Sequence, residues 1–221
     1  MFKSKSRQIV TPQSEHLKLV GTLAMLWGND QFDSPSIELT SMIMGMGLHD
    51  RGYGYLDNAP VGGMRDEEWE IIARRGFNME CSDVVADTIV KYHFRRLASY
   101  GTSEIRKNLH ADFSKELDDQ LKKFNLSRPL FDRMDRITDL LDRLSYEFCF
   151  DVPASGSISL FPRNAEEKEI TIEYHIENGE INVTPWTFSV NEHQGYLIAY
   201  HIDGYPQRQD PVILPYRLIR K

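Results

Sequence analysis

The sequence has few cysteines and no long hydrophobic run. Its 221 residues include two cysteines, Cys81 and Cys149, with no metal-binding spacing, as is typical of a chain without a disulfide framework. No uninterrupted apolar stretch reaches about 18 residues, so a transmembrane helix is not expected. The basic start of the chain is not followed by the apolar segment of a secretory signal. These absences predict a cytoplasmic protein that does not enter a membrane.

Positive charge is also in deficit. Lysine and arginine number 26 against 33 aspartates and glutamates, which gives a formal net charge of -7. This balance argues against extended binding to a nucleic-acid backbone, although a local basic patch could hold a small phosphorylated ligand. The chain has neither a Walker-type phosphate loop nor a Gly-x-Ser-x-Gly elbow, so those two kinds of catalytic site are excluded.

The first two-thirds of the chain show helical periodicity. One helix is expected to start at Thr11-Pro12, with Thr11 as N-cap and Pro12 as the first helical residue. Further helices are predicted over residues 36–49, 66–75, 81–100, 103–124 and 129–150. Residues 51–65 contain four glycines and one proline and are predicted to form a long loop of the kind that often carries function.

Beyond residue 151 the pattern changes to the period of two that half-buried strands show. Strands are predicted over residues 157–160, 170–176, 181–183, 196–202 and 212–214. Asn178-Gly179 is a strong hairpin turn between two of them. The sequence therefore predicts an α+β fold, with a mostly helical bundle in residues 1–151 and a small antiparallel β extension in residues 152–221 packed on it.

The pair His49-Asp50 is the most informative chemical feature of the sequence. Gly52 follows closely and permits a turn, so both side chains could reach one ion. An imidazole nitrogen with a carboxylate oxygen suits zinc, iron, manganese or cobalt. His16 and His93 lie on apolar faces of predicted helices. Each is either a core histidine or a further ligand.

Asp142 lies at the edge of the apolar stripe of the last predicted helix, where a carboxylate is unfavourable unless it is paired or binds a metal. Pairing with Arg143 or Arg136 is one alternative, and Asp139 is a rival for its role. Three helices thus direct a histidine or aspartate inward and a fourth ends in His-Asp. Helical bundles build metal sites from facing side chains in this way.

The order His16, His49-Asp50, Asp142 resembles the HD-domain superfamily of metal-dependent phosphohydrolases. The chain is also similar to an uncharacterised bacterial family known only as a domain of unknown function. That second similarity rests on Glu15-His16, Leu26-Trp27-Gly28, His49-Asp50-Arg51-Gly52-Tyr53, His93, Asp142-Arg-Leu-Ser145 and Pro185-Trp186, and it covers most of the chain. The resemblance implies an HD-like bundle in which His16, His49, Asp50 and Asp142 ligate a first metal ion.

Some HD proteins hold a second ion. The resemblance then implies Asp50 as a bridging carboxylate and His93 as a further ligand, whereas His110 lies in a polar run typical of a solvated helix face. For catalysis we expect Asp50, Arg51 and His93 to act. Arg95 and Arg96 are further candidates to neutralise phosphate charge. Tyr53 and Tyr55 are candidates to stack on a base or to line the pocket.

The expected activity is metal-dependent hydrolysis of a phosphomonoester or phosphodiester in a small phosphorylated metabolite or nucleotide. The expected cofactor is one or two divalent ions of manganese, iron, zinc or cobalt. Two alternatives stay open: an HD-type di-iron oxygenase, and a non-catalytic metabolite-binding or sensor protein. The strand-rich end of the chain, with Trp186 and Phe188, is a candidate homodimer contact.

Overall fold

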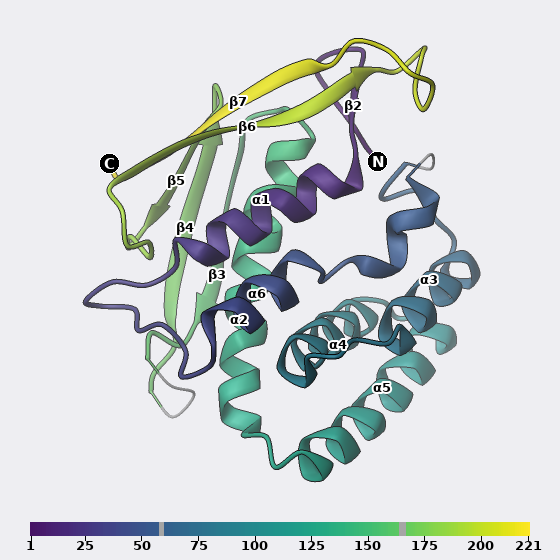
Figure 1. The fold of residues 1–221 in the computed structure, drawn as a ribbon, viewed down its shortest axis with the longest axis vertical. Helices are drawn as coiled ribbons and strands as arrows, with labels where there is room; N and C mark the ends of the chain where they lie inside the picture. Colours follow the sequence, from purple (N-terminus) through teal and green to yellow (C-terminus); the bar gives the residue numbers. More distant parts are fainter. Residues whose placement is uncertain (58–59, 164–166) are drawn as a thin grey trace.

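The computed structural model describes residues 1–57, 60–163 and 167–221 and has an α+β fold (Figure 1). All six predicted helical segments are helical within these ranges. They are α1 (Gln13–Met25), α2 (Leu39–Gly47), α3 (Asp66–Asn78), α4 (Val84–Ser99), α5 (Glu104–Lys123) and α6 (Arg128–Cys149). None of these helices has the length and apolar character needed to cross a membrane.

Several helix starts differ from their predicted positions, and one of them is α2, which begins at Leu39 and not at residue 36. Thr11 ends a strand instead of capping α1, and Pro12 is the N-cap residue. Helix α4 begins at Val84 because the carboxylate of Asp83 accepts hydrogen bonds from the next two free amides, those of Val85 and Ala86. Asp83 thus provides the side-chain oxygen that an N-cap needs, and the helix begins three residues after its predicted start at residue 81.

A seven-stranded sheet curls around one side of α6 and α1 (Figure 1). Its strands are β1 (Phe2–Lys3), β2 (Ile9–Thr11), β3 (Ala154–Leu160), β4 (Ile170–Glu177), β5 (Glu180–Thr184), β6 (Glu192–His201) and β7 (Val212–Ile219). Their order in the sheet is β1-β2-β6-β7-β5-β4-β3. All five strands predicted for the end of the chain are present.

The expectation of a purely C-terminal, purely antiparallel sheet is wrong in two respects. Strands β1 and β2 come from the start of the chain, and β2 pairs with β6. They have two and three residues, too few for an alternating pattern to appear in the sequence. In addition β5 and β7 are parallel, because the β6–β7 hairpin places β7 beside β5. Alternation reports which face of a strand is buried and not the direction of its neighbour.

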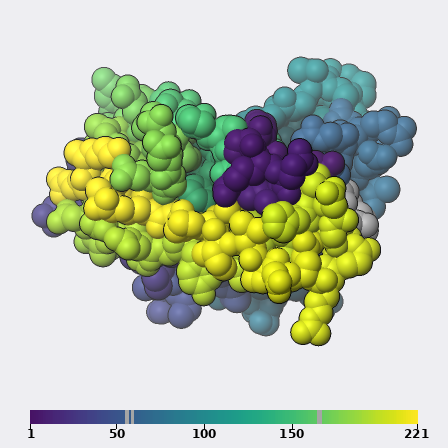
Figure 2. Space-filling view, turned by 90° about the horizontal axis from the view of Figure 1, so that it is seen from above, coloured from purple at the N-terminus to yellow at the C-terminus, as the bar shows by residue number. Residues whose placement is uncertain are grey.

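The start of the chain lies beside the end of β6 as a result, although the two termini are far apart in Figure 1. Figure 2 shows the N-terminal segment next to the C-terminal strands on one face of the molecule, in agreement with the pairing of Ile9 with His201. One hydrophobic core continues from the helices into the sheet and includes Phe2, Leu141 and Leu160. Residues 1–11 are therefore part of the β layer, outside the helical region to which the sequence assigned them.

Helix α6 lies between the sheet and the remaining helices, and it contacts α1, α4, β3 and β4 (Figure 1). Much of the predicted loop after α2 is the short 3-10 helix η1 (Arg51–Leu56). It lies so close to α3 that a Cβ atom on Gly52 would stand 2.4 Å from the carbonyl oxygen of Ile72. Glycine at this position therefore lets η1 pack directly against the backbone of α3.

Candidate metal centre

Five ionisable side chains from four parts of the helical layer meet at one point. His16 lies in α1, His49 and Asp50 directly follow the C-cap of α2, His93 lies in α4, and Asp142 lies in α6. The three histidines are buried, with at most 1% of their surface exposed. The structure thus brings together all five residues that the sequence suggested as ligands.

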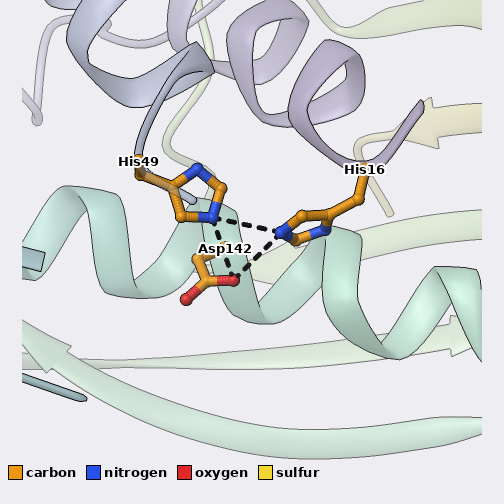
Figure 3. A group of neighbouring side chains, drawn as sticks. All are labelled: His16, His49 and Asp142. Atoms are coloured by element: carbon orange, nitrogen blue, oxygen red, sulfur yellow. Dashed lines mark hydrogen bonds and ion pairs between the residues drawn. The ribbon is translucent and has the colours of Figure 1, made fainter. Parts of the chain in front are cut away.

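Three ligand-type atoms of this cluster face one another. Nε2 of His16 and Nε2 of His49 are 3.1 Å apart, and each is 3.4 Å from Oδ1 of Asp142 (Figure 3). Oδ2 of Asp50 lies 3.8 Å from the first nitrogen and 3.9 Å from the second. Atoms bound about 2.1 Å from one ion at tetrahedral or octahedral angles lie about 3.0–3.4 Å apart. The spacing of the first three atoms therefore suits ligation of a single ion.

The hydrogen bond behind His49 also fits a metal ligand. Nδ1 of His49 lies 2.7 Å from the carbonyl oxygen of Met46, and because a carbonyl only accepts, Nδ1 carries the proton. Nε2 of the neutral ring then carries a lone pair, and this lone pair faces the cluster. Metal-ligating histidines commonly donate their second ring nitrogen to a backbone carbonyl in this way.

Two buried atoms in α1 lack hydrogen-bond partners among the described residues: Nδ1 of His16 and Oε1 of Gln13. A ligand role for Nε2 of His16 places the proton of the neutral ring on Nδ1. Metal binding would thus make Nδ1 of His16 a donor, and Oε1 of Gln13 is a buried acceptor that has no partner among the described residues. Gln13 lies three residues before His16 on the same helix, a spacing at which side chains are neighbours.

Charge in the cluster favours a cation. Burial raises the pKa of the Asp142 carboxyl, but hydrogen bonds from His16 and His49 outweigh it and hold that pKa well below its ordinary value. The pKa of Asp50 is also lowered overall, by His49 and His93 against the effect of burial. In return the two carboxylates raise the pKa of His49 despite its burial. The cluster therefore retains a proton that a metal ion would replace.

His93 stands on the other side of Asp50. Its Nε2 is 3.0 Å from Oδ1 of Asp50, and its Nδ1 is 2.9 Å from a guanidinium nitrogen of Arg96. Burial and the positive charge of His49 lower the pKa of His93, which favours the neutral ring. Asp50 thus directs one oxygen toward His16 and His49 and the other toward His93, the orientation expected of the bridging carboxylate that the resemblance implied.

A pocket of about 350 Å³ opens onto the cluster. Aspartate, histidine, aromatic and apolar side chains and one arginine form its wall. The lining residues are Asp50, Tyr53, Val61, Gly62, Met64, Asp66, Trp69, His93, Leu97, Tyr100, Gly101, Arg106, Asp142 and Tyr146. This described lining contains no serine, threonine, cysteine or lysine, so it offers no hydroxyl, thiol or amine nucleophile from those residues.

The structure does not bring Arg51 to the pocket, against the expectation that it neutralises phosphate there. Its guanidinium is buried and binds Asp87 at 2.8 Å and the carbonyl oxygen of Gly76 at 2.6 Å. Arg51 is the first residue of η1, and its side chain points between α3 and α4, whereas that of Asp50 faces the cluster. Arg51 therefore holds η1 against α3 and α4.

The other suggested residues divide between the pocket and its surroundings. Tyr53 lines the pocket and accepts a hydrogen bond from Trp69, whereas the side chain of Tyr55 lies outside the described part of the chain. Arg95 and His110 line a different pocket. Arg96 lies behind His93, and it also binds Asp139. Asp142 therefore faces His16 and His49, whereas its rival Asp139 binds Arg96.

Two residues that the sequence did not suggest complete the site. The side-chain amide of Gln13 donates to Oδ2 of Asp50 at 2.6 Å. Arg106, near the start of α5, lines the pocket with its guanidinium 3.4 Å from the ring centre of Trp69, and it pairs with Asp66. Neither residue belongs to a motif. Only the predicted position of Gln13, one turn before His16, pointed toward the cluster.

Comparisons with known proteins gave one match. Neither the curated proteins nor the solved structures contained a match to this chain. A family model described as a protein of unknown function, DUF3891, matches residues 1–200. This match covers most of the 221 residues, so the chain belongs to the DUF3891 family.

Proposed function

We propose that this protein is a metal-dependent phosphohydrolase that acts on a small phosphorylated molecule. The observation that carries the proposal is the convergence of His16 Nε2, His49 Nε2 and Asp142 Oδ1 within 3.4 Å of one another beside a pocket whose wall contains Arg106. His16, His49, Asp142 and Asp50 would hold the ion. Nitrogen and carboxylate donors of this kind suit zinc, iron, manganese or cobalt.

A bound divalent ion supplies a water of lowered pKa and polarises a phosphoryl oxygen. The protein's own residues orient the reactants. Asp50 and Asp142 are ionised at neutral pH because their pKa values are lowered, so their oxygens accept hydrogen bonds from a water in the pocket. In the proposed reaction water is the attacking group, as in other metal-assisted hydrolyses.

Arg106 is the candidate to bind the phosphate. Asp66 and the carbonyl oxygen of Leu97 occupy two of its N–H donors, whereas a guanidinium has five. Charge-assisted hydrogen bonds from arginine to phosphate are strong and directional. Tyr53, Trp69 and Tyr146 offer aromatic surface to the rest of the ligand, and the pocket volume of about 350 Å³ suits a small molecule.

The activity is tested with a panel of phosphomonoesters and phosphodiesters on protein reconstituted with manganese, iron, zinc or cobalt. We expect hydrolysis that depends on the metal, and a KM that rises about tenfold or more in Arg106→Ala, since a hydrogen bond to a charged group contributes about 1.5–3 kcal/mol. Arg75→Ala, in α3 and outside the lining, is the control. Metal-loaded protein without turnover across the panel would contradict the proposal and favour a non-catalytic binding protein.

A further inference from the structure

We infer that Arg96 fixes His93 as a hydrogen-bond donor to Asp50, so that His93 is a positioning residue and the centre binds one metal ion. This inference rests on the proposed metal site but not on the reaction. Its basis is a chain of two contacts. A guanidinium nitrogen of Arg96 is 2.9 Å from Nδ1 of His93, and Nε2 of His93 is 3.0 Å from Oδ1 of Asp50.

The chemistry of arginine decides which nitrogen of His93 carries the proton. A guanidinium has only donors and stays protonated in proteins. Nδ1 of His93 must therefore accept from Arg96, and the proton of the neutral ring is on Nε2. That N–H points at Oδ1 of Asp50, which accepts it. Both ring nitrogens are thus committed to hydrogen bonds.

Arg96 is itself held in place from several sides. Its Nε donates to Asp135 at 3.0 Å, and its Nη1 donates to Asp139 at 2.6 Å. Both carboxylates come from α6, the helix that carries Asp142. The arginine is 7% exposed, and the negative charges around it raise its pKa further despite its burial. The guanidinium therefore has no freedom to turn away from His93.

This arrangement opposes a second metal ion. His49, Asp50 and His93 have ligand atoms within 4.8 Å of one another, which by spacing alone would suit a second site. Ligation through Nε2 of His93 requires a lone pair there, and the proton would move to Nδ1. Two N–H groups, those of His93 and Arg96, would then face each other across 2.9 Å. The unpaired buried donor that results is unfavourable.

His93 serves the first metal site instead. Its hydrogen bond to Oδ1 turns the Asp50 carboxylate so that Oδ2 is directed at the nitrogens of His16 and His49. Outer hydrogen bonds of this type orient the ligands of a metal and strengthen its binding. The di-iron oxygenase alternative needs the second ion, so this geometry argues against it.

The first test is the tautomer of His93. Long-range ¹H–¹⁵N spectra of the metal-free protein, assigned with His93→Gln, should show the Nε2–H form. A predominant Nδ1–H form would overturn the inference. This readout does not depend on activity, and it remains available if the protein binds no metal at all.

The second test is metal stoichiometry. We expect about one equivalent in the wild type and in His93→Ala, with affinity weakened about 10–100-fold in that variant. His93→Gln, whose amide can still donate to Asp50, should lose less. Two equivalents in the wild type that fall to one in His93→Ala would overturn the inference and leave the proposed hydrolase intact. No metal in the wild type would contradict the proposed function and the one-ion centre together, whatever the tautomer. Circular dichroism checks that each variant is folded.

Discussion

The side-chain amide of Gln13 donates a hydrogen bond of 2.6 Å to Oδ2 of Asp50. This is the oxygen that is directed at the two nitrogens of His16 and His49. The backbone N–H of Gln13 is anchored in turn by Asp57, at 2.7 Å, and Asp57 accepts from Tyr205. The start of α1 thereby ties the candidate ligand Asp50 to the loop that follows β6.

Gln13→Leu should weaken metal binding about 10–100-fold, because it removes a hydrogen bond that orients a ligand. Isothermal titration with zinc or manganese measures the change. Gln31→Leu is the control, since Gln31 is exposed and does not line the pocket. Equal affinity in Gln13→Leu and the wild type would show that this hydrogen bond does not orient Asp50 for metal binding.

Arg51→Ala should destabilise the protein by about 3–5 kcal/mol, the range expected when one partner of a buried ion pair is removed. The side chains of Arg51 and Asp87 are only 5% and 11% exposed. Urea unfolding measures the loss, and Arg136→Ala, which breaks a surface pair with Glu169, should change stability by at most about 1 kcal/mol. A normal unfolding midpoint in Arg51→Ala together with a large rise in KM would instead support the phosphate-binding role expected from the sequence.

Asp83 should make a pH-dependent contribution to stability. Burial raises its pKa, but hydrogen bonds from Ser41, Ala86 and Val85 outweigh it, so the pKa in the folded protein is lowered. A lowered pKa means that the contribution is fully present above about pH 4, the ordinary value for aspartate, and is lost as the pH falls through the folded value.

Asp83→Ala should therefore reduce the free energy of unfolding by about 1 kcal/mol near neutral pH, as for other lost N-caps. The difference from the wild type should shrink below about pH 4. Asp210→Ala, at an exposed position outside the helices, serves as the control. A difference that stays constant from pH 7 to pH 3 would show that the charge of Asp83 does not contribute.

Local patterns in the sequence were enough to predict the helices and five of the strands, and together with the resemblance to the HD superfamily they pointed to the five clustered side chains. The local patterns are periodicity, turn residues and polar residues on an apolar face. Strands β1 and β2 were missed because they are too short to show a pattern, and their pairing depends on β6, almost 190 residues away. The parallel contact of β5 with β7 is likewise a property of the whole sheet.

The surroundings of the cluster were harder to predict than its members. Arg51 follows the His-Asp pair directly, yet its side chain is buried against Gly76 of α3 and Asp87 of α4. Arg106 is distant in sequence from the cluster and reaches the pocket only because α5 packs beside α3 and α4. Which residues bind metal stays a prediction, since convergence of ligand atoms is a condition for binding and not binding itself.

The most direct measurement is the metal content of the purified protein, determined by mass spectrometry for the wild type, His49→Ala and Asp142→Ala. His110→Ala is the matched control, because His110 lies outside the cluster. We predict about one equivalent of a transition metal in the wild type and the control, and its loss in the two cluster variants. A wild type that holds no metal after reconstitution with manganese, iron, zinc or cobalt, or cluster variants that retain it, would contradict the proposed centre.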